Sequence, residues 1–200
     1  MKVSAVIRQA VAYDALTWLL SLGRERRFRE QLIAPARLRE GESVLDVGCG
    51  TGTLALVAKR QVVNGEVVGI DASPEMIDRA RHKAARAGLQ LKFEVASADA
   101  LPFPAGSFDV VICTVALHHL RRSMRAAAVA EMRRVLKPSG RVLLADFVFG
   151  KKRTVAGLLH HHVGMKPDEL AQLADGAGLR AIDSGALGFW DLSYLVAQLH

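Results

Sequence analysis

From residue 43 onward, short apolar runs alternate with segments of helical periodicity. The five runs that read as buried strands cover residues 43–47, 67–71, 91–95, 108–114 and 141–147. Strands that alternate with helices are typical of a parallel sheet with helices on both faces. We therefore expect an α/β fold with a Rossmann-like, doubly wound sheet.

The helices between these runs carry recognisable start and stop signals. Ser73 and Pro74 suit the first turn of a helix that Gly88 can end. Further helices are predicted at residues 54–58, at 122–136 before a turn over 137–140, and at 167–177 before Gly178.

The two ends of the chain are less regular. Residues 179–183 and 190–196 are candidates for two more strands, which would make a mostly parallel, seven-stranded sheet, although residues 194–199 could equally be helical. Before residue 40 the pattern is helical. We expect one domain over 1–200, with a helical lid at 1–40, a cofactor-binding core at 41–147, and an acceptor-side segment that closes the sheet at 148–200.

Composition narrows the functional class. The chain has 200 residues, half of them apolar, and two cysteines that sit in core-like segments, so neither a disulfide scaffold nor a zinc site is expected. The apolar stretch at 15–22 is too short to span a bilayer, and arginines follow it. A cytoplasmic protein is expected. The net charge of +7 is compatible with nucleic acid, anionic lipid or acidic metabolites, but a solvated basic surface is the favoured explanation for most of these charges.

The strongest motif is a buried strand that runs into three glycines, VLDVGCGTG at residues 44–52. A dinucleotide fingerprint would need glycine where Thr53 stands, and a pyrophosphate would be repelled by Asp46. A sulfonium cofactor that carries an ammonium group would instead be attracted by Asp46. Asp71 ends the next strand, at the spacing that brings a carboxylate to ribose hydroxyls.

These motifs resemble those of the class I methyltransferases, and most closely those of the branch with the ubiquinone and menaquinone biosynthesis C-methyltransferases. The matching segments are residues 44–52, 67–80, 98–120 and 131–147, in the family's order. The resemblance implies that S-adenosylmethionine is the cofactor, with Asp71 on the ribose, Ala72 or Met76 on adenine, and Asp99 on the adenine amino group. The full set expected at the cofactor is Tyr13, Asp46, Gly48, Cys49, Gly50, Gly52, Asp71, Ala72, Met76, Asp99, Ala100 and Thr114.

The segment after the fourth predicted strand bears on the methyl acceptor. Methyltransferases of this fold that modify exocyclic amines of nucleic acids carry Asn or Asp followed by Pro-Pro and an aromatic residue there, whereas this chain reads CTVALHHL at 113–120. Nucleic acid is therefore a less favoured acceptor than a small-molecule or lipid-like, quinone-like compound. His118 and His119 are candidates for a general base, although either could simply cap the next helix or bond within the core.

Other interpretations remain open. The chain could be an inactive S-adenosylmethionine-binding partner or sensor, or a nucleotide-dependent oxidoreductase. The three histidines at 160–162 are adjacent, which disfavours a shared metal ion. The N-terminal helices are expected to form a lid, but Trp18 and the arginines of 24–29 would also suit an amphipathic element in peripheral contact with a membrane.

Overall fold

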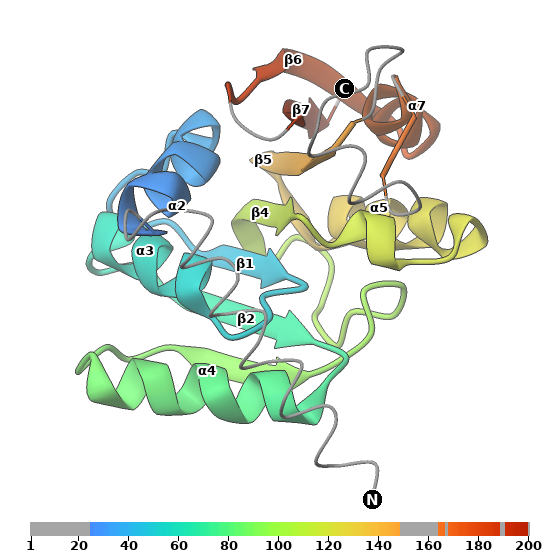
Figure 1. The fold of residues 1–200 in the computed structure, drawn as a ribbon. Coiled ribbons are helices and arrows are strands. Elements are labelled where there is room, and N and C mark those ends of the chain that lie inside the picture. Colours follow the sequence, from blue (N-terminus) through green and yellow to red (C-terminus); the bar gives the residue numbers. More distant parts are fainter. Residues whose placement is uncertain (1–24, 149–163, 167, 189–190, 200) are drawn as a thin grey trace, which may run out of the picture.

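A seven-stranded sheet with the order β3-β2-β1-β4-β5-β7-β6 forms the centre of the molecule (Figure 1). This computed structural model describes residues 25–148, 164–166, 168–188 and 191–199. The strands are β1 (Val44–Val47), β2 (Val67–Asp71), β3 (Lys92–Val95), β4 (Phe108–Thr114), β5 (Leu136–Phe147), β6 (Leu179–Ala186) and β7 (Leu192–Leu199). The first five are parallel, and β7 runs antiparallel to both of its neighbours. The predicted Rossmann-like α/β fold is confirmed.

Helices cover both faces of the sheet. They are α2 (Glu25–Ile33), the 3-10 turn η1 (Ala34–Ala36), α3 (Thr53–Val62), α4 (Pro74–Arg86), the 3-10 turn η2 (Leu117–His119), α5 (Arg122–Val135) and α7 (Glu169–Gly176). Apolar residues of α2, α3 and α4 form one buried cluster, and those of α5 and α7 form the other. Alternation along β4 divides the strand between them: Val111 and Cys113 face α5, while Val110 and Ile112 face α3.

The start of α4 agrees with the sequence. Ser73 is the N-cap, and its hydroxyl accepts a hydrogen bond from the amide of Met76 at 3.3 Å. Pro74 occupies the first turn, where its missing amide proton costs nothing. Gly88 follows the helix with φ +64°, the left-handed conformation that glycine adopts most readily.

Strand β6 runs to Ala186, beyond the predicted end at residue 183, and β5 and β7 also differ from the prediction. Strand β5 begins at Leu136 rather than at residue 141. Leu136 pairs with Phe108 and Arg141 pairs with Val110. Residues 137–140 therefore have no ladder partner in β4, which agrees with the turn predicted there. Strand β7 extends through Leu199, and its residues 192–198 pair with β5. The helical alternative for 194–199 is therefore wrong, because the edge of β5 offers this segment backbone partners that its own periodicity cannot reveal.

The sheet order also locates the ligand-binding edge. The chain moves outward from β1 to β2 and β3, then returns to place β4 on the other side of β1. In open α/β sheets, ligands bind at the carboxyl ends of the strands where the order reverses.

Within the expected lid, α2 packs on α3, while residues 1–24 lie outside the described part. No helix among the described residues is long and apolar enough to cross a membrane.

Candidate active site

A cavity of about 420 Å³ opens at the carboxyl ends of β1, β2, β3 and β4. This volume is within the range of about 300–1,000 Å³ that is usual for small-molecule sites. Its wall comes from five places: the glycine-rich turn, the turns after β2 and β3, the segment 113–116 with His119 and Leu120, and Arg29 of α2. The cavity therefore lies at the point where the strand order reverses.

The glycine-rich turn can hold its shape only without side chains. Gly48 has φ +73°, and a Cβ atom there would lie 2.6 Å from the Cβ of Ala116. Gly50 has φ +53°, but a Cβ atom there would meet nothing within 4 Å. Gly48 is thus required both by its backbone conformation and by close packing on the segment after β4, whereas Gly50 is required by conformation alone.

Asp71 joins this turn to the end of β2. Its Oδ2 accepts a hydrogen bond from the amide of Gly50 at 2.9 Å, and its Oδ1 accepts one from the amide of Ser73 at 2.9 Å. A carboxylate has about four acceptor positions, so two such bonds leave acceptor capacity on the cavity side. Asp71 is therefore oriented by the backbone while it still faces the cavity.

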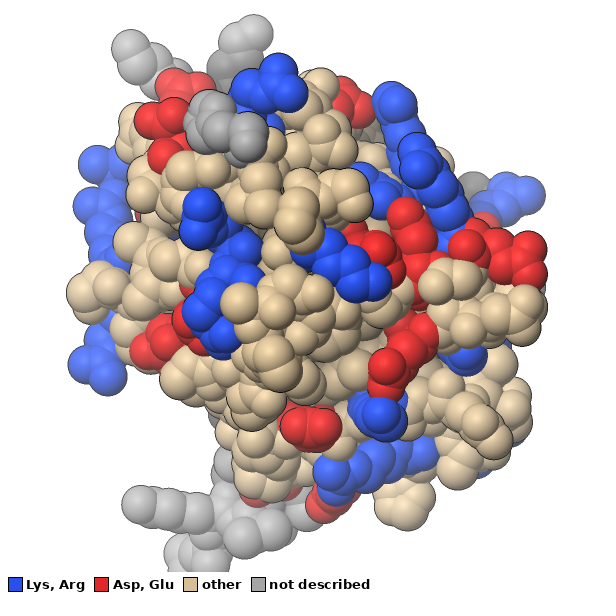
Figure 2. Space-filling view, turned by 180° about the vertical axis from the view of Figure 1, so that it is seen from behind, with Lys and Arg blue, Asp and Glu red and all other residues tan. Residues whose placement is uncertain are grey.

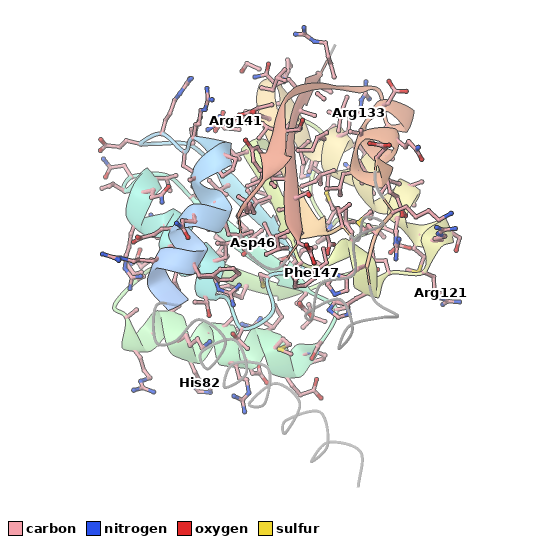
Figure 3. All side chains as sticks on the ribbon, turned by 45° about the horizontal axis from the view of Figure 1, so that its top comes forward. Asp46, His82, Arg121, Arg133, Arg141 and Phe147 are labelled. Atoms are coloured by element: carbon pink, nitrogen blue, oxygen red, sulfur yellow. The ribbon has the colours of Figure 1, made fainter. Side chains whose placement is uncertain are left out.

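Asp46 is a buried acid on the cavity wall, in the middle of the molecule (Figure 3). Only 1% of it is exposed, and its Oδ2 finds no hydrogen-bond partner among the described residues. Burial raises the pKa of Asp46 to about 7; the positive charge of Arg29 opposes that rise and the negative charge of Asp71 adds to it. A buried acceptor without a partner is costly, so this atom is suited to a ligand that brings a donor or a positive charge.

The backbone is strained at Val115, which also lines the cavity. Val115 adopts φ +53°, a left-handed conformation that β-branched residues rarely take. Its amide donates to the carbonyl of Ala145 in β5 at 2.7 Å, which holds the segment after β4 in place. Such strain persists only where surrounding contacts impose it, and it is common at functional sites.

The two adjacent histidines have different environments. His119 lies on the cavity wall, and burial together with the nearby His118 lowers its pKa, although Asp146 and Asp71 oppose this. The His118 side chain is 5% exposed and turns away to Asp146, with Nδ1 2.5 Å from Oδ1. The ring centroids of the two histidines are 3.9 Å apart.

Comparisons with known proteins fit this geometry. A family model described as a methyltransferase domain matches residues 44–140. The ubiquinone/menaquinone biosynthesis C-methyltransferase UbiE of Paraburkholderia phymatum is 38% identical over an alignment of 227 positions, which covers 100% of this chain and 90% of that relative. The chain belongs to the class I methyltransferase family.

Two further relatives support this membership. The demethylmenaquinone methyltransferase of Thermus thermophilus is 41% identical over 138 residues, which are 69% of this chain and 62% of that relative. The chain therefore matches less than two thirds of that relative's length. A solved S-adenosylmethionine-dependent methyltransferase from Aquifex aeolicus is 25% identical with a TM-score of 0.70, covering 84% of this chain and 88% of that structure.

Most of the residues that the sequence predicted at the methyltransferase cofactor do line this cavity. The wall includes Asp46, Gly48, Cys49, Gly50, Asp71, Ala72, Met76 and Thr114, together with His119 of the two base candidates. Gly52, Asp99, Ala100 and His118 do not line it. Asp99 is hydrogen-bonded to the Ser97 hydroxyl in the turn after β3, and Tyr13 lies outside the described residues.

Sequence reasoning missed Arg29 and Asp146. Arg29 was grouped with a basic cluster suited to lipid, yet only 7% of it is exposed and it lines the cavity. A signal was present, because Arg29 precedes the buried Leu32 and Ile33 by three and four residues and so shares their helix face. Asp146 carried no signal, since its partner His118 is 28 residues away in the chain.

No cluster of three or more potential metal ligands occurs among the described residues. The histidines at 160–162 lie outside that part of the chain.

Proposed function

We propose that this chain is an S-adenosylmethionine-dependent methyltransferase that acts on a small, quinone-like acceptor. The observation that carries the proposal is the cavity itself. Its wall combines a glycine-rich turn, a buried acid whose Oδ2 has no hydrogen-bond partner among the described residues, and a second acid held by backbone amides. These are the polar groups that a zwitterionic nucleoside ligand requires. An active methyltransferase is favoured over an inactive S-adenosylmethionine-binding protein because both curated relatives named above are methyltransferases.

Asp46 and Arg29 are suited to the amino-acid end of the cofactor. The buried carboxylate can accept from an ammonium group, and the guanidinium can pair with a carboxylate. The two side chains interact electrostatically, and Arg29 opposes the rise in the pKa of Asp46. A ligand that carries one positive and one negative charge could therefore pair with Asp46 and Arg29 at the same time.

The remaining contacts follow the same logic. Asp71 keeps acceptor capacity for ribose hydroxyls, while Ala72 and Met76 provide apolar surface for the adenine ring. The bare backbone at Gly50 allows close approach of the ligand. When bound, S-adenosylmethionine supplies a methyl group on a cationic sulfur that leaves as a neutral thioether. The protein's own part is to bind, align and exclude water.

The acceptor side of the cavity supports a small apolar substrate. Val115, Ala116 and Leu120 line the cavity together with His119. The curated relatives are named for demethylmenaquinone and for ubiquinone and menaquinone biosynthesis, which favours a reduced quinone as the acceptor class. A nucleic acid is less suitable: on the face in Figure 2, lysines and arginines are interspersed with acids instead of forming a phosphate-binding track.

Binding and turnover test the proposal separately. We expect calorimetry to detect S-adenosylhomocysteine and not NAD, and labelled methyl from S-adenosylmethionine to enter 1,4-naphthoquinol kept reduced by dithionite. Arg29→Met should weaken S-adenosylhomocysteine binding by about 10-fold or more, because a charge-assisted bond is lost. Arg27→Met is the matched control, since Arg27 is exposed on the same helix. Equal affinities of the two variants would contradict the role of Arg29, and absence of binding by the unmodified protein would contradict the proposed function.

A further inference from the structure

Asp146 is the most enclosed acid in the described part of the chain, and it is engaged almost entirely by one residue. It is 0% exposed, at the carboxyl end of β5. Its Oδ1 lies 2.5 Å from Nδ1 of His118, and its Oδ2 accepts from the amide of the same residue at 3.1 Å. The amide of Phe147 also donates to Oδ1 at 2.8 Å. This hydrogen-bond network assigns the ring proton of His118 to Nδ1.

The ring of His118 is fixed on both sides. It packs edge-on against Phe147, with ring centroids 5.7 Å apart, and lies 3.9 Å from the ring of His119 at an angle of 45°. His119, by contrast, lies on the cavity wall. The residues therefore form a series from the buried acid through one imidazole to a second imidazole that faces the cavity.

Arg125 of α5 holds the backbone of residues 118–120, which follow β4. Its guanidinium donates to the carbonyls of Leu120 at 3.2 Å and His118 at 3.3 Å, and it pairs with Glu169 of α7 at 2.7 Å. The side chains of Arg125 and Glu169 are 10% and 12% exposed. The bonds from His118 to Asp146 and those from Arg125 to the carbonyls thus fix the same three residues independently. A simple connection between β4 and α5 would not require both.

Helix capping does not explain the histidines. The N-cap of α5 is Arg121, and no side chain caps this helix. The bonds of His118 go to β5 instead. A purely structural role would be sufficient for His118, but it gives no reason for a second imidazole to stack on the first and face the cavity.

We propose that His119 accepts a proton from the methyl acceptor, that His118 and Asp146 are the positioning residues that hold it, and that the acceptor is therefore one whose nucleophilic atom must lose a proton. This rests on the proposed function. As the acceptor atom forms its bond to the methyl carbon, the bond from carbon to sulfur breaks and its electron pair stays on sulfur. The proton of the acceptor's hydroxyl, or of the quinol carbon that has been methylated, passes to a ring nitrogen of His119.

The electrostatic surroundings suit this role. The titratable groups that act on His119 are His118, Asp146 and Asp71. Burial and His118 lower the pKa of His119, so the ring is neutral and able to accept a proton at pH 7. The two acids limit that fall, which keeps the imidazole basic enough to be useful.

The test compares four variants of the full chain. His119→Gln and Asp146→Asn alter the proposed series. His82→Gln and Asp175→Asn are their matched controls, because both residues are exposed on helices, and Figure 3 shows His82 on the outer side of α4. For each variant we would measure S-adenosylhomocysteine affinity by calorimetry and the pH profile of kcat with reduced 1,4-naphthoquinol. Acceptors with an ionisable proton (the naphthoquinol and a catechol) are compared with two that lack one (nicotinamide and a dialkyl thioether).

We expect His119→Gln to lower kcat by about 100-fold or more, with partial recovery at high pH where the acceptor ionises unaided, and with KM and S-adenosylhomocysteine affinity within about threefold. Asp146→Asn should lower kcat by about 10-fold and move the acidic limb of the profile to lower pH, because a charge that raises the pKa of His119 is gone. The controls should match the unmodified protein.

Three results would overturn the proposal. One is normal kcat in both variants, and another is a loss that appears in S-adenosylhomocysteine affinity without any movement of the acidic limb. The third is a chain that methylates only the acceptors without an ionisable proton. The first two leave the proposed function standing, since the unmodified chain would still methylate the naphthoquinol. The third also contradicts the quinone-like acceptor, but it does not contradict binding of S-adenosylhomocysteine. If the unmodified chain does not bind it, both proposals fall together.

Discussion

The carboxylate of Asp71 accepts a hydrogen bond from the amide of Gly50 at 2.9 Å, so the end of β2 fixes the turn that follows β1. Because the same carboxylate faces the cavity, a single side chain both shapes the turn and presents acceptor atoms to a ligand.

Asp71→Ala should therefore weaken S-adenosylhomocysteine binding by about 10-fold or more, since charge-assisted hydrogen bonds are worth about 1.5–3 kcal/mol each. Calorimetry measures the affinity, and thermal melting monitors the fold. Asp78→Ala, at an exposed site on α4, is the control. An Asp71→Ala protein that folds and binds normally would contradict the assignment.

Asp46 should reduce the stability of the free protein. Its pKa of about 7 lies above the ordinary value of 3.8, so the folded state gives up this proton at higher pH than the unfolded chain does. The free energy of unfolding therefore falls as the pH rises from 3.8 to about 7. Asp46→Asn removes this penalty and should raise Tm at pH 7.5 by about 2–4 °C or more.

The same variant should bind S-adenosylhomocysteine more weakly, because the negative charge that suits an ammonium group is lost. Melting curves at pH 4 and pH 7.5, combined with calorimetry, separate the two effects. The stability gain should be small at pH 4. A variant that is less stable at pH 7.5, or one that binds equally well, would be inconsistent with a buried ligand-binding acid.

Gly48→Ala tests the packing of the glycine-rich turn. The new Cβ would lie 2.6 Å from the Cβ of Ala116, so backbone must shift on one side of the cavity. Gly106→Ala is a matched control, because Gly106 has φ +68° and a Cβ atom there would meet nothing within 4 Å. Both variants carry the cost of a left-handed alanine, about 1–2 kcal/mol.

Only Gly48→Ala should add an overpacking cost of about 1–3 kcal/mol and lose S-adenosylhomocysteine binding. Urea unfolding measures the difference between the two variants. If they are equally stable and both bind, the contact between Gly48 and Ala116 does not constrain the turn.

Asp109 should make stability depend on pH in the acidic range. It accepts hydrogen bonds from Lys137 at 2.8 Å and from the Ser43 hydroxyl at 2.7 Å. Burial alone would raise the pKa of Asp109, but these bonds outweigh burial and lower it from 3.8 to about 2. The stabilisation is therefore complete above pH 3.8 and is lost as the pH falls through 2.

Asp109→Asn should lower the free energy of unfolding at pH 7 by about 2 kcal/mol, and the difference from the unmodified protein should shrink between pH 4 and pH 2. A series of urea titrations across this range measures it. A difference that stays constant with pH would mean that the charge of Asp109 is not what stabilises the protein.

The sequence by itself determined the parts of this protein that depend on neighbours along the chain. Apolar periodicity identified the five parallel strands, and the cap at Ser73 identified the start of α4, because both are set by local conformation. The glycine spacing at 48–52 and the acid at Asp71 predicted a ligand-binding turn for the same reason, and Gly48, Gly50 and Asp71 do line the cavity.

Only the tertiary structure decided the matters that depend on groups distant in sequence. Strand β7 is a strand because β5 offers it an antiparallel edge. Arg29 lines the cavity with Asp46 because α2 packs on α3. The two histidines differ because, of the two, only His118 is hydrogen-bonded to Asp146 on β5. Burial and electrostatic interaction act through space, so adjacent residues of the same type can have different environments that no local pattern records.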